Sequence, residues 1–255
     1  MRVLKIGGRA QSDPMLTRVI RDAWRAAPGA LCVVHGGGDE VSAMQRALGR
    51  EAAFVGGRRV TSQGDLELLR MVLSGVVNKR LVSSLVAADV PAVGLSGEDG
   101  ALIGAEFIDR AVLGYAGRPV SINKDLLTSL MNTGYLPVVS PVAFNGESGV
   151  GGALNVNGDD AAAAIAAALG ASELMLVADV EGVLDADDRV IGNLTVEQAR
   201  EMIANGTAAA GMAAKLESGE AALMSGVTSV RICALRGVGD PRGGTFLTQS
   251  QSVAI

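Results

Sequence analysis

The chain has 255 residues, of which 49% are hydrophobic and 19% charged, a balance that excludes a disordered or fibrous protein. A formal net charge of −5 and only 3% aromatic residues leave no basic, aromatic-rich surface, so we expect no nucleic-acid partner. The longest apolar run, residues 161–171, is shorter than the roughly 20 residues that cross a bilayer, so we expect no membrane partner.

The chain reads as successive βαβ units. Short β-branched runs alternate with longer stretches at helical spacing, which is typical of an α/β fold with a mainly parallel sheet. In the first part of the chain we expect a strand at 3–6, a helix at 13–26 capped by Ser12 or Asp13, a strand at 31–34, a helix from Asp39, one or two helices over 64–88 and a strand at 91–95. Hairpins over 101–122, a helix at 124–133 and a strand at 136–140 follow. The last part should contain an alanine-rich helix from Gly158 or Asp159, a strand at 173–177, helices near 195–204 and 212–226, and a strand at 229–234. The best candidate for a domain boundary lies near residue 171, after the alanine-rich helix, where a second set of strand and helix patterns begins. We therefore predict two lobes, 1–171 and 172–255, that share one sheet.

The two cysteines indicate the compartment. Cys32 and Cys233 lie in separate apolar runs, far apart in the chain, and lack the close spacing of a metal site. We interpret them as buried thiols in a reducing environment. No signal peptide is recognisable, because Lys5 interrupts what would be its apolar region. We therefore expect a cytoplasmic protein.

Three glycine clusters are candidate anion-binding loops: Gly7-Gly8, Gly36–38, and the run of Gly149, Gly151 and Gly152. Glycine lets backbone N–H groups approach an anion closely, and a following helix adds the positive end of its dipole. The alternative is that they form ordinary tight turns. Neither a P-loop nor a strict GxGxxG motif is present. A serine hydrolase with HGGG as its oxyanion hole is excluded, because no GxSxG elbow exists and His35 precedes the candidate serines.

Only four of the 22 basic residues are lysines, and two of them lie in unusual surroundings. Lys5 lies within an apolar strand, where a charge needs a partner or a ligand unless the side chain reaches solvent at the strand end. Lys215 follows Gly211-Met212 among small apolar residues and by itself resembles a helix-surface lysine. Asp159 and Asp160 begin the alanine-rich helix, where one suffices as a cap and the other is left for another role.

Together with their neighbours, these residues resemble the ordered motifs of acetylglutamate kinases, in the amino acid kinase family. The matching blocks are VLKIGG at 3–8, VVHGGG at 33–38, RRVT at 58–61, VNKRL at 77–81, GLSGEDG at 94–100, GYLPVVSPV at 134–142, LNVNGDDAA at 154–162, LVADVEGVLD at 176–185 and GMAAK at 211–215. The resemblance implies a three-layer α/β/α sandwich with an N-terminal acceptor lobe and a C-terminal nucleotide lobe. It also implies transfer of the γ-phosphoryl group of ATP to the side-chain carboxylate of N-acetyl-L-glutamate, for arginine biosynthesis.

The resemblance assigns roles residue by residue. Lys5 and Lys215 match the lysines that stabilise the transferring phosphoryl group, and Asp159 matches the acid that orients both. The residues that match the acceptor-binding positions are Gly37, Gly38, Arg59 and Asn155. The residues that match the nucleotide-binding positions are Gly7, Gly8, Asp179, Val180, Glu181, Gly182, Val183, Leu184, Thr207, Ala208 and Ala209. We expect no metal site of protein side chains, because the Mg²⁺ that accompanies ATP is held mainly by phosphates and water.

The sequence departs from the family pattern at four places. Arg58 replaces the usual Leu, Gly56-Gly57 replaces Asn-Gly, Gly158 replaces Ala, and Ala210 stands where Gly or Asp is usual. An extra arginine beside the acceptor favours a more anionic substrate, so N-succinylglutamate or a carrier-protein-linked aminoadipate or glutamate is the alternative acceptor. The other interpretation of Arg58 is a side chain that faces solvent.

The oligomeric state is a further expectation. Arginine-inhibited hexamers of the family carry an additional N-terminal helix, whereas this sequence starts at its first strand. The resemblance therefore predicts a homodimer that is insensitive to arginine. Of the remaining lysines, we expect Lys79 to have a structural role in the acceptor lobe, and the sequence suggests no role for Lys124.

Overall fold

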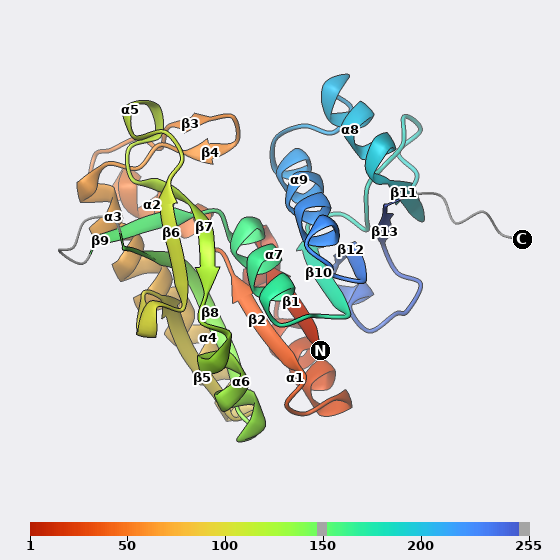
Figure 1. The fold of residues 1–255 in the computed structure, drawn as a ribbon, viewed down its shortest axis with the longest axis horizontal. Coiled ribbons are helices and arrows are strands. Elements are labelled where there is room, and N and C mark those ends of the chain that lie inside the picture. The colour runs from red at the N-terminus through yellow and green to blue at the C-terminus, as the bar shows by residue number, and fades with distance from the viewer. Residues whose placement is uncertain (147–151, 250–255) are drawn as a thin grey trace, which may run out of the picture.

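The computed structural model describes residues 1–146 and 152–249. They contain an 11-stranded sheet in the order β11-β13-β12-β10-β1-β2-β8-β6-β7-β9, with β5 paired to β8 (Figure 1). Its strands are β1 (Arg2–Ile6), β2 (Leu31–His35), β5 (Ala92–Gly97), β6 (Ile103–Phe107), β7 (Ala116–Ile122), β8 (Leu136–Asn145), β9 (Gly152–Val156), β10 (Glu173–Ala178), β11 (Asn193–Thr195), β12 (Ser229–Ala234) and β13 (Thr245–Thr248). A separate hairpin joins β3 (Phe54–Val55) to β4 (Arg58–Arg59).

Helices cover both faces of this sheet, which confirms the α/β/α sandwich with a mainly parallel centre. They are α1 (Leu16–Ala26), α2 (Gly38–Ala47), α3 (Gln63–Leu69), α4 (Asn78–Ala87), α5 (Arg110–Leu113), α6 (Lys124–Asn132), α7 (Gly158–Ala168), α8 (Val196–Ala204) and α9 (Ala210–Met224). None of the helices in the described ranges has the length and hydropathy needed to cross a membrane.

The alternation of side chains along β1 sorts its residues between the two layers. Leu4 and Ile6 pack into the cluster formed with α1 and α4. Val3 lies in the opposite cluster, which α7 and α9 share, so Lys5 is directed to that same side. Since β1 lies in parallel register between β2 and β10, Lys5 is held at the centre of the sheet.

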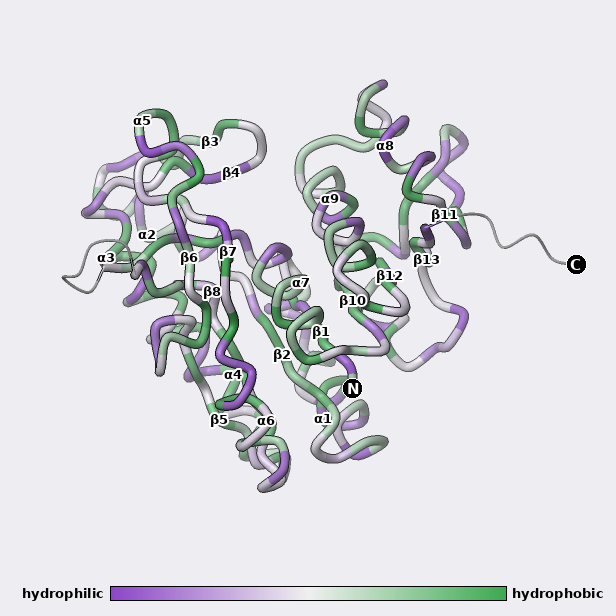
Figure 2. The backbone as a smooth tube through the Cα atoms, viewed as in Figure 1, coloured by the Kyte–Doolittle hydropathy of each residue, from purple (hydrophilic) through white to green (hydrophobic). Residues whose placement is uncertain are grey.

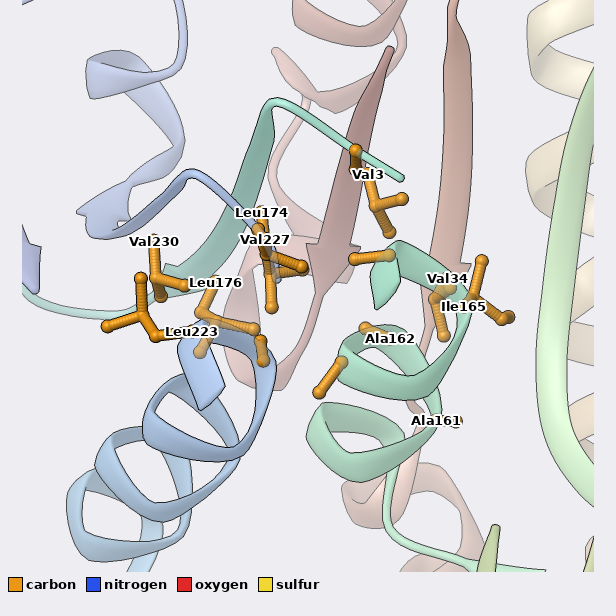
Figure 3. Close-up of a cluster of buried hydrophobic side chains, with 14 of the residues drawn as sticks. Val3, Val34, Ala161, Ala162, Ile165, Leu174, Leu176, Leu223, Val227 and Val230 are labelled. Atoms are coloured by element: carbon orange, nitrogen blue, oxygen red, sulfur yellow. The ribbon is translucent and has the colours of Figure 1, made fainter. Parts of the chain in front are cut away.

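The alanine-rich sequence of α7 is explained by its packing. Ala161, Ala162 and Ala166 are fully buried, and Figure 3 shows α7 beside α9, with their side chains directed toward those of β1, β10 and β12. Small side chains let the two helices and the sheet approach closely, and a helix that is apolar on most sides is one that is buried. Figure 2 shows the same distribution, with hydrophobic residues along the central strands and α7 and hydrophilic ones in the outer loops.

Several local expectations need correction. Helix α1 begins at Leu16 after a 3₁₀ turn over Gly8–Ser12, so neither Ser12 nor Asp13 is its cap. The long helical region contains a π-helical segment, Arg70–Val77, between α3 and α4. The expected hairpin is the antiparallel β6–β7 pair, with α5 inserted. Strands β3, β4, β9, β11 and β13 were not anticipated, because short strands carry little periodicity of their own.

The sheet passes without interruption from one expected lobe to the other, because β1 pairs directly with β10. The division at residue 171 stays a prediction. In the third glycine cluster, Gly149 and Gly151 lie outside the described residues, while Gly152 is the first residue of β9.

Candidate active site

The candidate site lies where the parallel strands β1, β2 and β10 end. Gly7 and Gly8 follow β1, Gly36 to Gly38 follow β2, and Asp179 follows β10. Because the carboxyl ends of parallel strands meet at one edge of a sheet, loops far apart in sequence are brought together there, which is the usual position of ligands in such folds.

A carboxylate bridges two lysines at this edge. Asp159 Oδ1 lies 2.9 Å from Lys5 Nζ, and Asp159 Oδ2 lies 3.1 Å from Lys215 Nζ. Lys5 and Asp159 are 6% and 4% exposed. The cap of α7 is Asn157, whose side chain accepts a hydrogen bond from the Asp159 N–H at 2.7 Å. The expectation of an aspartate cap was therefore wrong, and the carboxylate of Asp159 is left to face the lysines.

The charges in this cluster depend on one another. Burial by itself would raise the pKa of Asp159, but the ammonium groups of Lys5 and Lys215 outweigh it and hold that pKa below its ordinary value. Burial and the neighbouring Lys5 ammonium lower the pKa of Lys215, against the opposing effect of Asp159. Two cations close to one carboxylate carry an excess positive charge, which suits an anionic ligand.

Cavities lie on both sides of the cluster. One of about 210 Å³ is lined by residues that include Lys5, Gly37, Gly38, Arg59, Asn155 and Asp159. Another of about 330 Å³ is lined by residues that include Gly7, Gly8, Asp179, Val180, Gly211 and Lys215. We call them the first and the second cavity. Lys5 lines the first and Lys215 the second, so Asp159 joins two binding spaces.

The guanidinium of Arg59 is held rigidly in the wall of the first cavity. It donates to Gln45 Oε1 at 2.5 Å, to the Gly38 carbonyl at 2.9 Å and to Ser42 Oγ at 2.8 Å, and it lies 4.8 Å from the centre of the Phe54 ring. These hydrogen bonds use three of the five N–H donors of a guanidinium. The planar fork is thereby oriented before any ligand binds.

Comparison with known proteins identifies the family. Residues 1–234 match the model of the amino acid kinase family. The chain belongs to this family. It is 40% identical to an acetylglutamate kinase of Chloroflexus aurantiacus over 98% of this chain and 97% of the relative. It is 43% identical to an acetylglutamate kinase of Cereibacter sphaeroides over 90% of this chain and 78% of the relative. The solved structure of smu.665 from Streptococcus mutans UA159 superposes with a TM-score of 0.87 at 30% identity and covers 98% of each chain.

Two glycines of this amino acid kinase lie where any other residue would be strained. Gly37 has φ +147°, and a Cβ there would lie 2.7 Å from Leu73 Cδ2. Gly8 has φ +55°, and a Cβ there would lie 2.8 Å from Asp179 Oδ1. Both conformations favour glycine, and both glycines line the first cavity. Their strand-to-helix turns are thus both tight turns and walls of the site.

The expected nucleotide residues separate into two groups. The second cavity is lined by Gly7, Gly8, Asp179 and Val180. Glu181, which is ion-paired with Arg236, lines an adjoining cavity of about 420 Å³. The others lie in the surrounding turns and line none of these three cavities: Gly182, Val183, Leu184, Thr207, Ala208 and Ala209. Val183 is buried, and its N–H donates to Thr245 Oγ1 at 2.7 Å, so this part of the loop is attached to the first residue of β13.

The most important contact that sequence reasoning missed concerns Arg58. Its Nη1 donates to Asp160 Oδ2 at 2.6 Å, so Arg58 neither faces solvent alone nor offers an unpaired charge to a ligand. The doubled aspartate was the available signal, since it left one carboxylate without an assigned partner. Residues 58 and 160 are distant in the chain, so only the fold shows that they meet.

A buried polar network supports the Gly36–38 turn. His35 Nδ1 lies 2.8 Å from the Gly36 carbonyl, and His35 Nε2 lies 3.0 Å from Asn78 Nδ2. The Asn78 amide donates to Nε2, so the proton is on Nδ1 and the ring is neutral. Burial lowers the pKa of His35 to about 4. Lys79 donates to Asn78 Oδ1 and to the Gly94 carbonyl, each at 3.0 Å, which agrees with its expected structural role.

No cluster of three or more His, Cys, Asp or Glu side chains capable of holding a metal occurs in residues 1–146 and 152–249. The donors that converge at the site are ammonium, guanidinium and backbone N–H groups. Such donors bind anions, and a divalent cation there would have to arrive with its own anionic ligands.

Proposed function

We propose that this chain is an ATP-dependent acetylglutamate kinase that acts in arginine biosynthesis. The reaction transfers the γ-phosphoryl group of ATP to the side-chain carboxylate of N-acetyl-L-glutamate, giving an acyl phosphate and ADP. Relatives named acetylglutamate kinase at 40% and 43% identity support it. The observation that carries the proposal is the Lys5–Asp159–Lys215 bridge between two cavities.

The bridge suits phosphoryl transfer, which requires alignment and positive charge more than covalent chemistry. Lys5 faces the acceptor and Lys215 faces the nucleotide, so their ammonium groups act on the two sides of the transferring phosphoryl. Asp159 holds both lysines in place. A compact ammonium group with rotatable donors follows a moving phosphoryl better than a planar guanidinium does.

The remaining roles follow from the position of each residue. Arg59 binds the α-carboxylate of the acceptor through the N–H groups that its contacts with Gln45, Gly38 and Ser42 leave free, and Asn155 binds its amide-bearing end. The backbone N–H groups of Gly37 and Gly38 serve the acceptor. Those of Gly7 and Gly8 serve the phosphoryl group. The segments 179–184 and 207–209 bind or support the nucleotide, whose phosphates, together with water, hold the Mg²⁺ ion and thereby offset their charge.

Arg58 bears on the identity of the acceptor. An unpaired guanidinium in the first cavity would favour an additional carboxylate, as in N-succinylglutamate. Here the charge of Arg58 is matched by Asp160 at 2.6 Å, which favours the uncharged acetyl group. N-Acetyl-L-glutamate is therefore the acceptor that we propose.

We also propose a cytoplasmic homodimer. Met71, Val76 and Val86 each expose more than half of their surface along the helical stretch from α3 to α4, which makes this stretch our candidate for the dimer interface. Sedimentation of the wild type at the mass of two chains, and of the Met71→Glu/Val76→Glu variant at the mass of one, is the expected result.

Trapping of the acyl phosphate with hydroxylamine tests the activity. The purified chain is incubated with Mg-ATP and N-acetylglutamate, N-succinylglutamate or aminoadipate, and hydroxamate is measured. We expect product mainly from N-acetylglutamate. Absence of product from every acceptor contradicts the kinase proposal, whereas preference for a different acceptor contradicts only the proposed substrate.

A further inference from the structure

The carboxylate next to the lysine bridge forms a second bridge of its own. Asp160 Oδ2 accepts a hydrogen bond from Arg58 Nη1 at 2.6 Å, and Asp160 Oδ1 accepts one from Ser218 Oγ at 2.7 Å. The side chains of Arg58 and Asp160 are 31% and 18% exposed, so this ion pair is partly shielded from solvent. Hydrogen bonds between charged groups are the stronger ones.

The first end of this bridge is the β3–β4 hairpin. Phe54, Gly57, Arg58 and Arg59 all line the first cavity, so the hairpin is part of its wall. Each strand has only two residues, and β3 is exposed. A two-stranded hairpin of this size is not stable by itself, so its position depends on contacts with the rest of the protein.

The other end of the bridge is α9. Ser218 lies three residues after Lys215 in this helix, and residues at that spacing share a face. Asp159 therefore contacts Lys215, and Asp160 contacts Ser218, on adjacent turns of the same helix. Figure 1 shows the tip of the hairpin directed toward the loop that precedes α9, and a Cβ at Gly57 would lie 4.0 Å from the Ala210 carbonyl oxygen.

We propose that Arg58 and Asp160 form a latch, completed by Ser218, that holds the β3–β4 hairpin over the acceptor and links it to the helix carrying Lys215. The proposal rests on the kinase function proposed above. Arg58 and Asp160 are positioning residues, because they act through the hairpin and α9. The consequence is that acceptor and nucleotide bind cooperatively, since closing the hairpin over one ligand sets the position of a helix that contacts the other.

The kinetic test compares the wild type with Arg58→Ala, Asp160→Ala and the double variant. We expect each single change to raise the KM for N-acetylglutamate about tenfold while kcat changes much less, because the lysine bridge is retained. The double variant should be no worse than either single one, as expected for partners in one interaction. Arg58→Lys should recover part of the loss. Arg118→Ala, which removes an equally short 2.6 Å ion pair with Glu106, should leave both constants unchanged.

Calorimetry with a non-hydrolysable ATP analogue measures whether the acceptor changes the Kd of the nucleotide. This coupling would not change if Arg58 and Asp160 only stabilised the fold. In the wild type, saturating N-acetylglutamate should lower the Kd of the analogue. In Arg58→Ala and Asp160→Ala this effect should disappear. An unchanged KM and an undiminished effect in both variants would overturn the latch, as would losses that add in the double variant.

Hydrogen exchange tests whether the latch exists without an assay of kinase activity. In the ligand-free proteins, the amides of residues 53–60 should exchange about tenfold faster in Asp160→Ala than in the wild type or Arg118→Ala. Equal exchange overturns the latch. If the wild type transfers no phosphoryl group, the kinase proposal fails, but this comparison still shows whether the latch exists.

Discussion

Lys215 Nζ lies 3.1 Å from Asp159 Oδ2, the carboxylate whose other oxygen contacts Lys5. Lys215→Ala removes one of the two cations that face the proposed phosphoryl path. We expect kcat to fall by about a hundredfold or more, as on loss of other transition-state donors. Steady-state kinetics check this result, with the melting temperature as the control for folding. Lys124→Ala, at an exposed lysine on α6, should keep the wild-type kcat, and a near-normal kcat for Lys215→Ala would contradict the assigned role.

Because His35 is buried in its neutral form, we expect the free energy of unfolding to fall in acid. Its pKa is about 4 in the folded protein, against 6.5 for the ordinary group. Between these pH values the unfolded chain binds a proton that the folded chain does not, so the free energy of unfolding falls as the pH falls, by about 3 kcal/mol in all. Urea titrations at pH 7 and pH 4.5 measure the difference. His35→Gln should reduce this pH dependence, and an equal dependence in that variant would show that other groups cause it.

Ala210 occupies a conformation that suits glycine. It has φ +45° at the start of α9, where a Cβ costs about 1 kcal/mol. Ala210→Gly should therefore raise the free energy of unfolding by up to about 1 kcal/mol, less the greater entropy of glycine in the unfolded chain. Chemical denaturation measures it. The matched control is Ala213→Gly, within the same helix, which should lower the stability; a stability loss in both variants would refute the proposed strain.

The two thiols are predicted to be unreactive in the folded protein. Burial raises the pKa of Cys32 to about 12 and, as the main cause, that of Cys233 to about 11, and both side chains are fully buried. Thiolate is the reactive form, so a chromogenic disulfide reagent at pH 8 should label neither residue within minutes, but should label both in denaturant. Fast labelling of the native chain would show that one of the two sites opens readily.

The elements that could be predicted from sequence are those with a strong local pattern of apolar residues. Strands β1, β2 and β10 read as short apolar runs, and α7 reads as a continuous helix, because burial on both sides leaves only apolar residues. The glycine doublets and Lys5 were visible for the same reason, since each contrasts with its immediate neighbours. The short strands β11 and β13 escaped, because an edge strand of three or four residues is decided by its pairing.

The sequence by itself determined the α/β class, the glycine turns at the ends of the strands, and the residues Lys5, Asp159 and Lys215 as candidates. The class and the turns depend on residues close together in the chain, whereas Lys215 became a candidate only through the resemblance to the motifs of acetylglutamate kinases. Only the tertiary structure decided that Asn157 caps α7, that Asp159 contacts both lysines, and that Asp160 contacts Arg58. The physical reason is that the partner of a carboxylate is set by the order of strands and the packing of helices, which bring together residues that local periodicity cannot relate.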